Sequence, residues 1–295
     1  MMKLLTPTRP ADLPTDALLA RLRCRRAAID LAADHVIEAP VADAVGWIYQ
    51  RLNTRLRKQL EPVLDLLAMR NLILTLRYNL AGEPPPATVL SNSLLAEPLK
   101  RLTTATEEAE TTVAQLEAIL NKDYPFITGL ATTYRNQGPG GVEQQLTGGI
   151  LQHGLTRACS KTLKRTLRYL IDMRNCLMIH KLWRWQIKQA PPLVAGGRVA
   201  TSSLQRIWAT HDSERLSRLT SRLTGAPLIS TETVGMEQSL LNGLTRLLRR
   251  AGRDPLGLAV VIEYLWRAQL AVHNQGLRQA LAPDREELLA EVLLL

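Results

Sequence analysis

The sequence has few cysteines and few aromatic residues, and it lacks a hydrophobic run that could span a membrane. Its three cysteines, Cys24, Cys159 and Cys176, are widely spaced and form no C-x-x-C pair. This usage is typical of a reducing compartment and supplies no thiolate cluster for zinc. The longest apolar stretch, 256–262, ends at Glu263, far short of the roughly 20 residues that a spanning helix needs. We therefore expect a soluble, cytoplasmic chain without a signal peptide, with attachment to a membrane surface still open.

Positive charge is abundant. The chain has 37 Lys and Arg residues against 27 Asp and Glu residues, a formal net charge of +10 at pH 7. This charge permits a nucleic acid, anionic lipid headgroups or an acidic protein as partner, and it does not choose among them. The apolar content of 46% indicates a globular protein rather than a disordered one.

Helical periodicity dominates the chain, and leucine, alanine and arginine favour helix by intrinsic propensity. Strand-like alternation is absent except for a short stretch at 195–201. The fold class is therefore expected to be all-α. The pattern predicts long helical regions over residues 12–37, 41–82, 94–124 and 156–189, and shorter helices within 202–295.

Glycine and proline predict where these helices break. Region 41–82 is expected to be two helices that meet near Pro62 and end at Gly82. The most glycine-dense stretch, 134–154, is expected to be a mobile loop or a linker that breaks the helices.

A short motif occurs twice in the chain. Met-Arg-Asn, followed by an apolar run and a basic residue, occupies 69–77 and 173–181. Asn71 and Asn175 are thus 104 residues apart, and Asn274 takes the same place in a weaker copy 99 residues further on. Near-equal intervals favour three related helical units, although amphipathic helices can also resemble one another by chance. The corresponding domains would be helical bundles over residues 1–105, 106–210 and 211–295.

No enzyme motif stands out. The Gly-rich segment lacks the lysine and the helix signature of a phosphate-binding loop. His180, His211, Asp212 and Asp254 superficially resemble the metal set of helical HD-type phosphohydrolases, but Asp212 is easily explained as the N-cap of a helix. Cys176 lies on an apolar helix face, which indicates packing rather than a nucleophile. We expect no catalytic, cofactor or metal site.

Basic clusters occur at helical spacing opposite leucines, as on a solvated helix face. In a nucleic-acid-binding protein they would contact phosphates, and tryptophans could stack on bases. A basic helical nucleic-acid-binding protein is therefore the alternative function. The clusters are 21–26, 55–58, 161–168 and 246–253, and the tryptophans are Trp183, Trp185 and Trp266.

The C-terminal stretch 254–281 resembles the signature of a known family, the central-stalk connectors of V/A-type ATPases, which are known as C in archaeal and bacterial enzymes and as d in eukaryotic ones. In that family a Pro-Leu start leads to an apolar helix, a tyrosine and then a Val-x-Asn. Acidic positions of the family are Gln269 and Ala271 here, and its Leu-Arg pair is displaced to Leu277 and Arg278. The matching residues are Pro255, Leu256, Ile262, Tyr264, Val272 and Asn274.

Three further segments resemble the same family in the same order. Residues 17–29 resemble its N-terminal Ala-Arg-x-Arg helix. Residues 169–184 resemble its central Asp-x-x-Asn helix, with Asp172 and Asn175 matching. Residues 193–208 resemble the turn that follows, with Gly196 and Gly197 in place.

The resemblance implies three similar helical bundles in a funnel-like arrangement about a pseudo-threefold axis. It implies a non-catalytic central-stalk connector, attached peripherally to the membrane, that joins the central-shaft subunits to the membrane proteolipid ring for H⁺ or Na⁺ transport. Neither a nucleic acid nor a small-molecule substrate is expected. Candidate repeat or socket positions are Arg70, Asn71, Arg174, Asn175 and Asn274. Candidate basic residues that face the ring or its lipid are Arg249 and Arg250.

Overall fold

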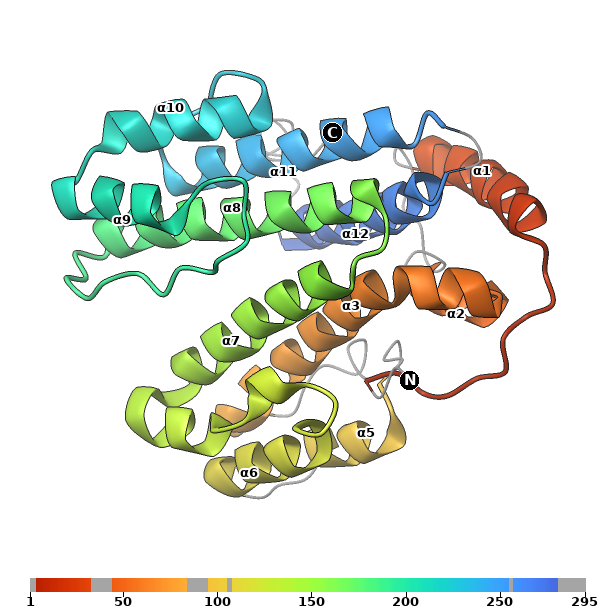
Figure 1. Cartoon of the computed structure of the whole chain (residues 1–295), viewed down its shortest axis with the longest axis horizontal. Coiled ribbons are helices and arrows are strands. Elements are labelled where there is room, and N and C mark those ends of the chain that lie inside the picture. Colours follow the sequence, from red (N-terminus) through yellow and green to blue (C-terminus); the bar gives the residue numbers. More distant parts are fainter. Residues whose placement is uncertain (1–3, 33–43, 84–94, 105–107, 255–256, 281–295) are drawn as a thin grey trace. The chain divides into compact units, whose positions relative to one another are not determined.

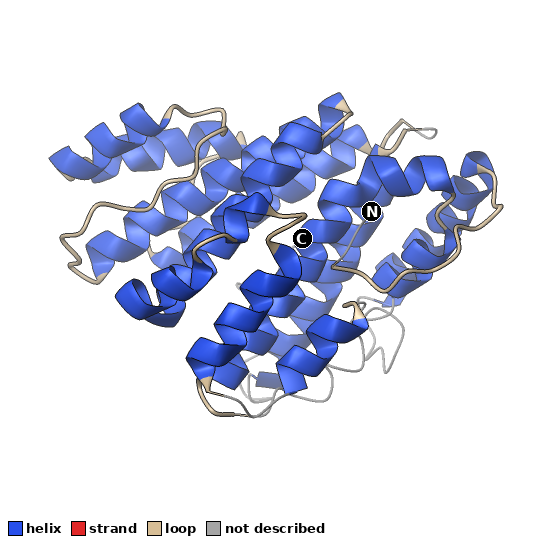
Figure 2. Cartoon of the chain, turned by 60° about the horizontal axis from the view of Figure 1, so that its bottom comes forward, coloured by secondary structure: helices blue, strands red, loops and turns tan. Residues whose placement is uncertain are grey.

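The chain is all-α, as predicted. The computed structural model describes residues 4–32, 44–83, 95–104, 108–254 and 257–280, and its regular elements there are helices (Figures 1 and 2). The described extended pairing is an isolated bridge between Leu5 and Leu95. No helix in these ranges is long and apolar enough to cross a membrane.

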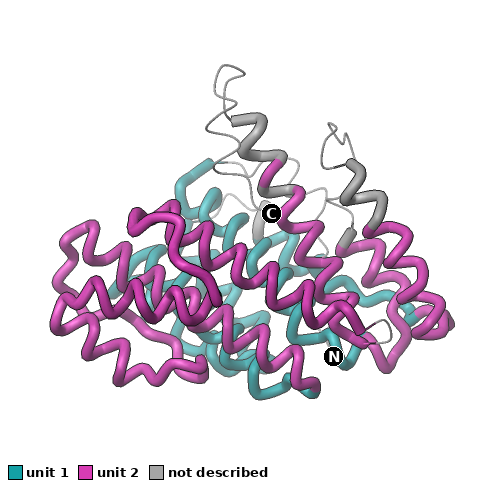
Figure 3. Tube along the Cα trace, turned by 90° about the horizontal axis from the view of Figure 1, so that it is seen from above, with its two compact units in different colours: residues 1–10, 57–159 teal, residues 11–56, 160–295 magenta. Residues whose placement is uncertain are grey.

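Two compact units divide the chain (Figure 3). Unit 1 comprises residues 1–10 and 57–159, and unit 2 comprises 11–56 and 160–295. The predicted arrangement of three bundles stays a prediction. Unit 1 contains most of α3 (Thr54–Leu80), with α5 (Glu97–Thr104), α6 (Ala109–Leu120), the 3₁₀ turn η1 (Pro125–Ile127) and α7 (Leu130–Arg157). Unit 2 contains α1 (Thr15–Ala32), α2 (Ala44–Arg51), α8 (Lys161–Arg184), α9 (Thr201–Thr210), α10 (Ser213–Thr224), α11 (Thr233–Ala251) and α12 (Ala259–Ala280).

The helix break predicted near Pro62 is wrong, because Pro62 lies inside α3. The break is at Asn53, whose side-chain oxygen accepts the backbone N–H of Leu56 at 2.9 Å and so starts α3. A proline inside a helix removes one hydrogen bond, and buried apolar residues on both sides of it support α3. Gly82 ends the helical region as predicted, with a left-handed φ of 72°.

The loop predicted at 134–154 is also wrong, because this stretch lies within α7. Its glycine density produces one kink, where Gly138 has a left-handed φ of 66° immediately before Pro139. Beyond the kink, buried apolar residues recur at helical spacing. A Cβ on Gly149 would lie 2.1 Å from the ring of Phe126, so this glycine lets η1 pack closely against α7.

Other predicted boundaries shift by a few residues. The helical region predicted at 94–124 is two helices, α5 and α6, and residues 105–107 between them lie outside the described part. The region predicted at 156–189 is α8, which begins after Ser160 because the Ser160 hydroxyl accepts the N–H of Leu163 at 3.0 Å. Residues 33–37 of the first predicted helix also lie outside the described part.

The core of unit 2 joins four helices, α8 to α11. Tyr169 of α8 donates its hydroxyl to the backbone carbonyl of Leu240 in α11 at 2.7 Å. Cys176 belongs to this core, as its apolar position predicted, and burial raises the pKa of its thiol to about 12. The buried cluster comprises Cys176, Ile179, Leu204, Ile207, Leu216, Met236 and Leu240.

Unit 1 contains a buried carboxyl, Asp65 of α3, which is 1% exposed. Burial raises the pKa of Asp65 to about 7, and the nearby Glu61 carboxylate raises it further, while a hydrogen bond with Tyr124 opposes the shift. Glu61 itself accepts an ion pair from Arg157 at 2.7 Å. One member of this carboxyl pair is therefore paired with a cation, and the other lies close to neutral.

The substitution Asp65→Asn should stabilise the protein above pH 7. Because the folded-state pKa is above the unfolded value of about 3.9, the folded wild-type chain holds the extra proton, and its stability falls as pH rises from about 4 to 7. The neutral amide avoids this loss, for a relative gain on the order of 2 to 3 kcal/mol at pH 8. Urea unfolding at pH 4.5 and pH 8 measures it.

The matched control is Asp12→Asn, which replaces an exposed carboxyl. It should leave the pH dependence of the unfolding free energy unchanged. A wild-type chain that loses no more stability between pH 4.5 and pH 8 than the Asp65→Asn variant would contradict the prediction.

Candidate functional site

Asn175 connects α8 to the loop that follows it. Its amide nitrogen donates to the backbone carbonyl of Val194 at 2.8 Å, and its amide oxygen accepts the backbone N–H of Val194 at 2.9 Å. Asn175 is fully buried, so both polar atoms of its side chain need these partners. An asparagine amide can meet both needs because it presents a donor and an acceptor side by side.

Asp172, three residues earlier on α8, holds the end of the same loop. Its two carboxylate oxygens accept the backbone N–H groups of Arg198 at 2.9 Å and Val199 at 3.1 Å. Burial raises the pKa of Asp172, and these two backbone donors lower it in opposition. We call Asp172 and Asn175, with the backbone of Val194, Arg198 and Val199, the loop latch.

The Gly-Gly pair of the loop is explained by the loop latch. Gly196 has a left-handed φ of 99°, a conformation that other residues rarely adopt. A Cβ on Gly197 would lie 2.1 Å from Oδ1 of Asp172. The first glycine is thus required by its backbone conformation, and the second by the close approach of a buried carboxylate.

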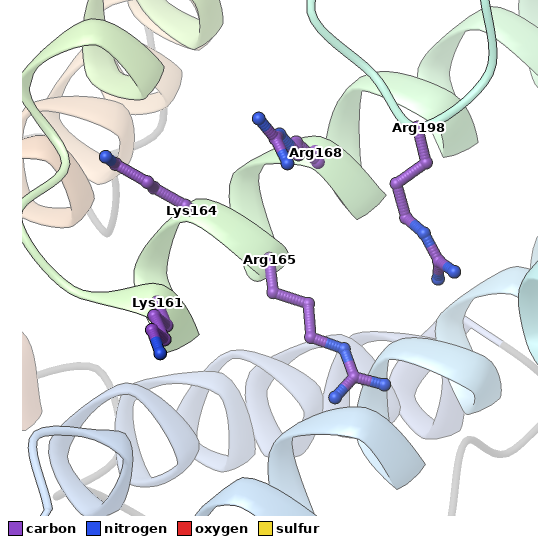
Figure 4. A pocket seen from close by; sticks show the side chains of 5 residues that line it. All are labelled: Lys161, Lys164, Arg165, Arg168 and Arg198. Carbon is purple, nitrogen blue, oxygen red and sulfur yellow. The ribbon is translucent and has the colours of Figure 1, made fainter.

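A basic pocket lies beside the loop latch (Figure 4). Four of its residues occupy positions i, i+3, i+4 and i+7 of α8, which places them on one helix face. The fifth, Arg198, comes from the latched loop. The pocket has a volume of about 340 Å³, and its lining residues are Lys161, Lys164, Arg165, Arg168 and Arg198.

The basic pocket has no acidic residue among its lining residues. All five side chains are exposed, and none of them makes an ion pair with a carboxylate in the part of the chain that the structure describes. Asp172 attracts Arg198, but its oxygens already accept two backbone N–H groups. Five like charges are therefore held together with little neutralisation from the protein.

Predicted socket positions differ in their surroundings. In unit 2, Arg174 donates to the carbonyl of Pro192 at 3.2 Å, so it holds the same loop as Asn175. In unit 1, Arg70 is exposed and Asn71 is half-buried, with its backbone carbonyl accepting the hydroxyl of Thr75. Asn274 of α12 is half-buried. The structural equivalence of the three asparagines stays a prediction.

Arg249 and Arg250, the predicted ring-facing residues, lie in the last turn of α11. Both side chains are exposed. Basic residues in the last turn of a helix also interact favourably with its dipole, so their position alone does not identify a partner. Their role at a membrane stays a prediction.

The residues of the hypothetical metal set have structural roles. Asp212 caps α10 by accepting the N–H of Arg215 at 2.8 Å, as predicted. His211 stacks on Trp183, with ring centroids 5.4 Å apart. Among the residues that the structure describes, no group of three or more His, Cys, Asp or Glu could hold a metal ion.

The tryptophans considered for base stacking are mostly engaged within unit 2. Trp183 stacks on Trp208, with ring centroids 6.0 Å apart. Trp266 donates its indole N–H to the hydroxyl of Thr245 at 2.9 Å. Trp185, at the end of α8, is 62% exposed.

The N-terminal and C-terminal segments that carry the resemblance meet within unit 2. Glu263 of α12 is 1% exposed and accepts Arg26 of α1 at 2.9 Å and Arg267 at 3.0 Å. Arg25 of α1 donates to the hydroxyl of Tyr264 at 3.2 Å. Of the C-terminal signature, Pro255 and Leu256 lie outside the described residues, and so do the side chains of Val272, Leu277 and Arg278.

Arg198 is the pocket residue that the sequence analysis missed. It belongs to none of the basic clusters, and it reaches α8 only because Asp172 binds its backbone N–H. The spacing of an Asp-x-x-Asn helix from a Gly-Gly pair was the signal that could have placed it there. Comparison with protein-family models and with curated proteins finds no match for this chain.

Replacing Asn175 by aspartate should destabilise unit 2. The change keeps the shape of the side chain but removes the donor to Val194 and places a buried negative charge against its carbonyl. We expect a loss of about 2 to 4 kcal/mol in unfolding free energy at pH 7, measured by urea unfolding.

Asn71→Asp is the matched control at the corresponding motif position. Its half-buried side chain should tolerate the charge with a change of less than about 1 kcal/mol. Equal losses for the two variants would contradict the role assigned to the loop latch.

Proposed function

We propose that this chain is the central-stalk connector of a rotary V/A-type ATPase, the role of the proteins known as C in archaeal and bacterial enzymes and as d in eukaryotic ones. The connector joins the central shaft to the membrane proteolipid ring so that both rotate together. Rotation then couples ATP turnover in the head to H⁺ or Na⁺ transport. The three-bundle funnel and peripheral attachment to the membrane are part of this proposal.

The loop latch is the observation that carries the proposal. Two segments resemble the family separately in sequence, the Asp-x-x-Asn helix and the Gly-Gly turn. Asp172 and Asn175 bind the backbone on both sides of that turn, and Gly197 has room only for hydrogen beside Asp172. Residues that carry the resemblance thus form one interdependent contact, which chance similarity between amphipathic helices does not explain.

The packing of α1 on α12 supports the same proposal. A closed arrangement about a pseudo-threefold axis requires the beginning and the end of the chain to meet. Arg25 and Arg26 of α1 contact Tyr264 and Glu263 of α12, and both helices belong to the segments that resemble the family. The contact between Glu263 and Arg26 is mostly buried on the acidic side, so it favours one arrangement of the two helices.

The composition suits a rotating connector at a membrane surface. Transmitting torque requires a stiff body, and each unit has a buried helical core. A positive charge near anionic headgroups contributes about 1 kcal/mol per suitably placed Lys or Arg. The alternative as a nucleic-acid-binding protein is less well supported, because Trp183, Trp208 and Trp266 contact other protein side chains.

Purification of the tagged chain from its native cells in mild detergent should recover the ATPase. Mass spectrometry should identify head, shaft and proteolipid subunits together, and an unrelated tagged helical protein of similar charge serves as the control. Recovery of soluble partners or nucleic acid without those subunits would overturn the proposed function.

Reversing the charge of Arg249 and Arg250 to glutamate should weaken attachment to the ring. With about 1 kcal/mol at stake per basic residue near anionic lipid, recovery of proteolipid should fall at least about tenfold at low salt. The ratio of proteolipid to shaft subunits in the pull-down measures the effect.

The control reverses Arg215 and Arg218 on α10, which are also exposed. This variant has the same net charge, so it separates a local contact from a general loss of positive charge. Unchanged ring recovery in the α11 variant, or an equal decrease in both variants, would count against these two residues as the contact.

A further inference from the structure

We propose that the basic pocket is a binding site for a compact phosphate-bearing anion, such as a diphosphate or triphosphate group. The inference goes beyond the connector function and does not rest on it. It adds a ligand where the sequence analysis expected none. The pocket residues come from two segments, α8 and the latched loop.

The geometry places the cations around a common space. Lys161, Lys164, Arg165 and Arg168 follow one face of α8, as their spacing requires. In Figure 4 the guanidinium groups of Arg165 and Arg198 extend in the same direction, one from α8 and one from the loop. Guanidinium groups bind phosphate oxygens with pairs of parallel hydrogen bonds.

The position of Arg198 is fixed before any ligand binds. Its backbone N–H donates to Asp172 at 2.9 Å, and the neighbouring N–H of Val199 donates to the same carboxylate. Asp172 is fully buried on α8, so the loop end cannot move without leaving that carboxylate unsatisfied. A site whose backbone is held in this way loses less entropy on binding.

The charges explain why the ligand should be an anion. Mutual repulsion of five nearby cations disfavours the folded state. No carboxylate among the described residues forms an ion pair with any of the five. The pocket also includes the first turn of α8, a helix of 24 residues, whose N-terminus carries partial positive charge. A bound polyanion would offset both contributions.

The size and the lining of the pocket narrow the ligand class. A volume of about 340 Å³ lies near the lower end for small-molecule sites. No aromatic residue lines the pocket, so neither a stacked base nor an apolar chain would find a partner there. Phosphate groups are therefore the recognised part, whether they belong to a free polyphosphate or to a lipid headgroup.

Calorimetric titration of the full chain with inorganic tripolyphosphate tests the site. At about 0.15 M salt, we expect saturable binding of one tripolyphosphate per chain. The double variant Arg165→Gln/Arg198→Gln removes two charge-assisted contacts and should weaken binding at least about tenfold.

The control, Arg249→Gln/Arg250→Gln, removes the same charge from exposed positions on α11. It should weaken binding less than about threefold, because exposed charges outside the pocket are screened at this salt concentration. Thermal unfolding of both variants checks that the fold is retained. Failure of tripolyphosphate to saturate, or an equal loss of affinity in both variants, would overturn the proposal.

Sedimentation with vesicles distinguishes the two sources of phosphate. Binding to vesicles that contain phosphatidylinositol bisphosphate, but not to phosphatidylserine vesicles of equal charge, would assign the site to a lipid headgroup if tripolyphosphate competes. Saturable tripolyphosphate binding without preference for these vesicles would assign it to a free polyphosphate. A single-stranded oligonucleotide that binds the pocket more tightly than tripolyphosphate, and is not displaced by it, would overturn the proposal in favour of nucleic acid.

Discussion

The buried carboxylate of Asp172 is the constraint on which the surroundings of α8 depend. A buried charge is costly unless hydrogen bonds replace its lost water, and the N–H groups of Arg198 and Val199 supply them. Their approach leaves no room for a side chain at Gly197. The same approach brings Arg198 beside the basic face of α8. One buried acid thus determines a glycine, a loop path and the fifth member of a cationic pocket.

The fold class could be predicted because helical periodicity reports burial directly. Local capping was equally visible, since the ends at Gly82 and Asp212 depend on residues next to the helix. Breaks inside helices were misjudged at Pro62 and at 134–154. There, local propensity opposes helix, but packing over many residues outweighs it. The closeness of Phe126 to Gly149 is a tertiary contact, so composition alone indicated a loop.

The site was predictable only in part. Asn175 was found from a repeated motif, which gave its position but not its partner, because Val194 lies beyond a proline-containing segment. The four cations on α8 were visible as a cluster and were interpreted as a solvated face. Their distinction from such a face is the arrival of Arg198, which depends on a contact with Asp172 across 26 residues of sequence. Contacts of this kind are not encoded in periodicity or spacing.

Resistance to sliding distinguishes the contacts of unit 2 from ordinary apolar packing. Leucine side chains can exchange neighbours at modest cost, because dispersion and hydrophobic burial have little directionality. Glu263 cannot, since moving α1 away from α12 would remove Arg26 from a carboxylate that is 1% exposed, and breaking a buried ion pair costs about 3 to 5 kcal/mol. Asp172 constrains the loop in the same way. In a part that transmits torque, such contacts would keep helix register under load, and they occur in the segments that resemble the connector family.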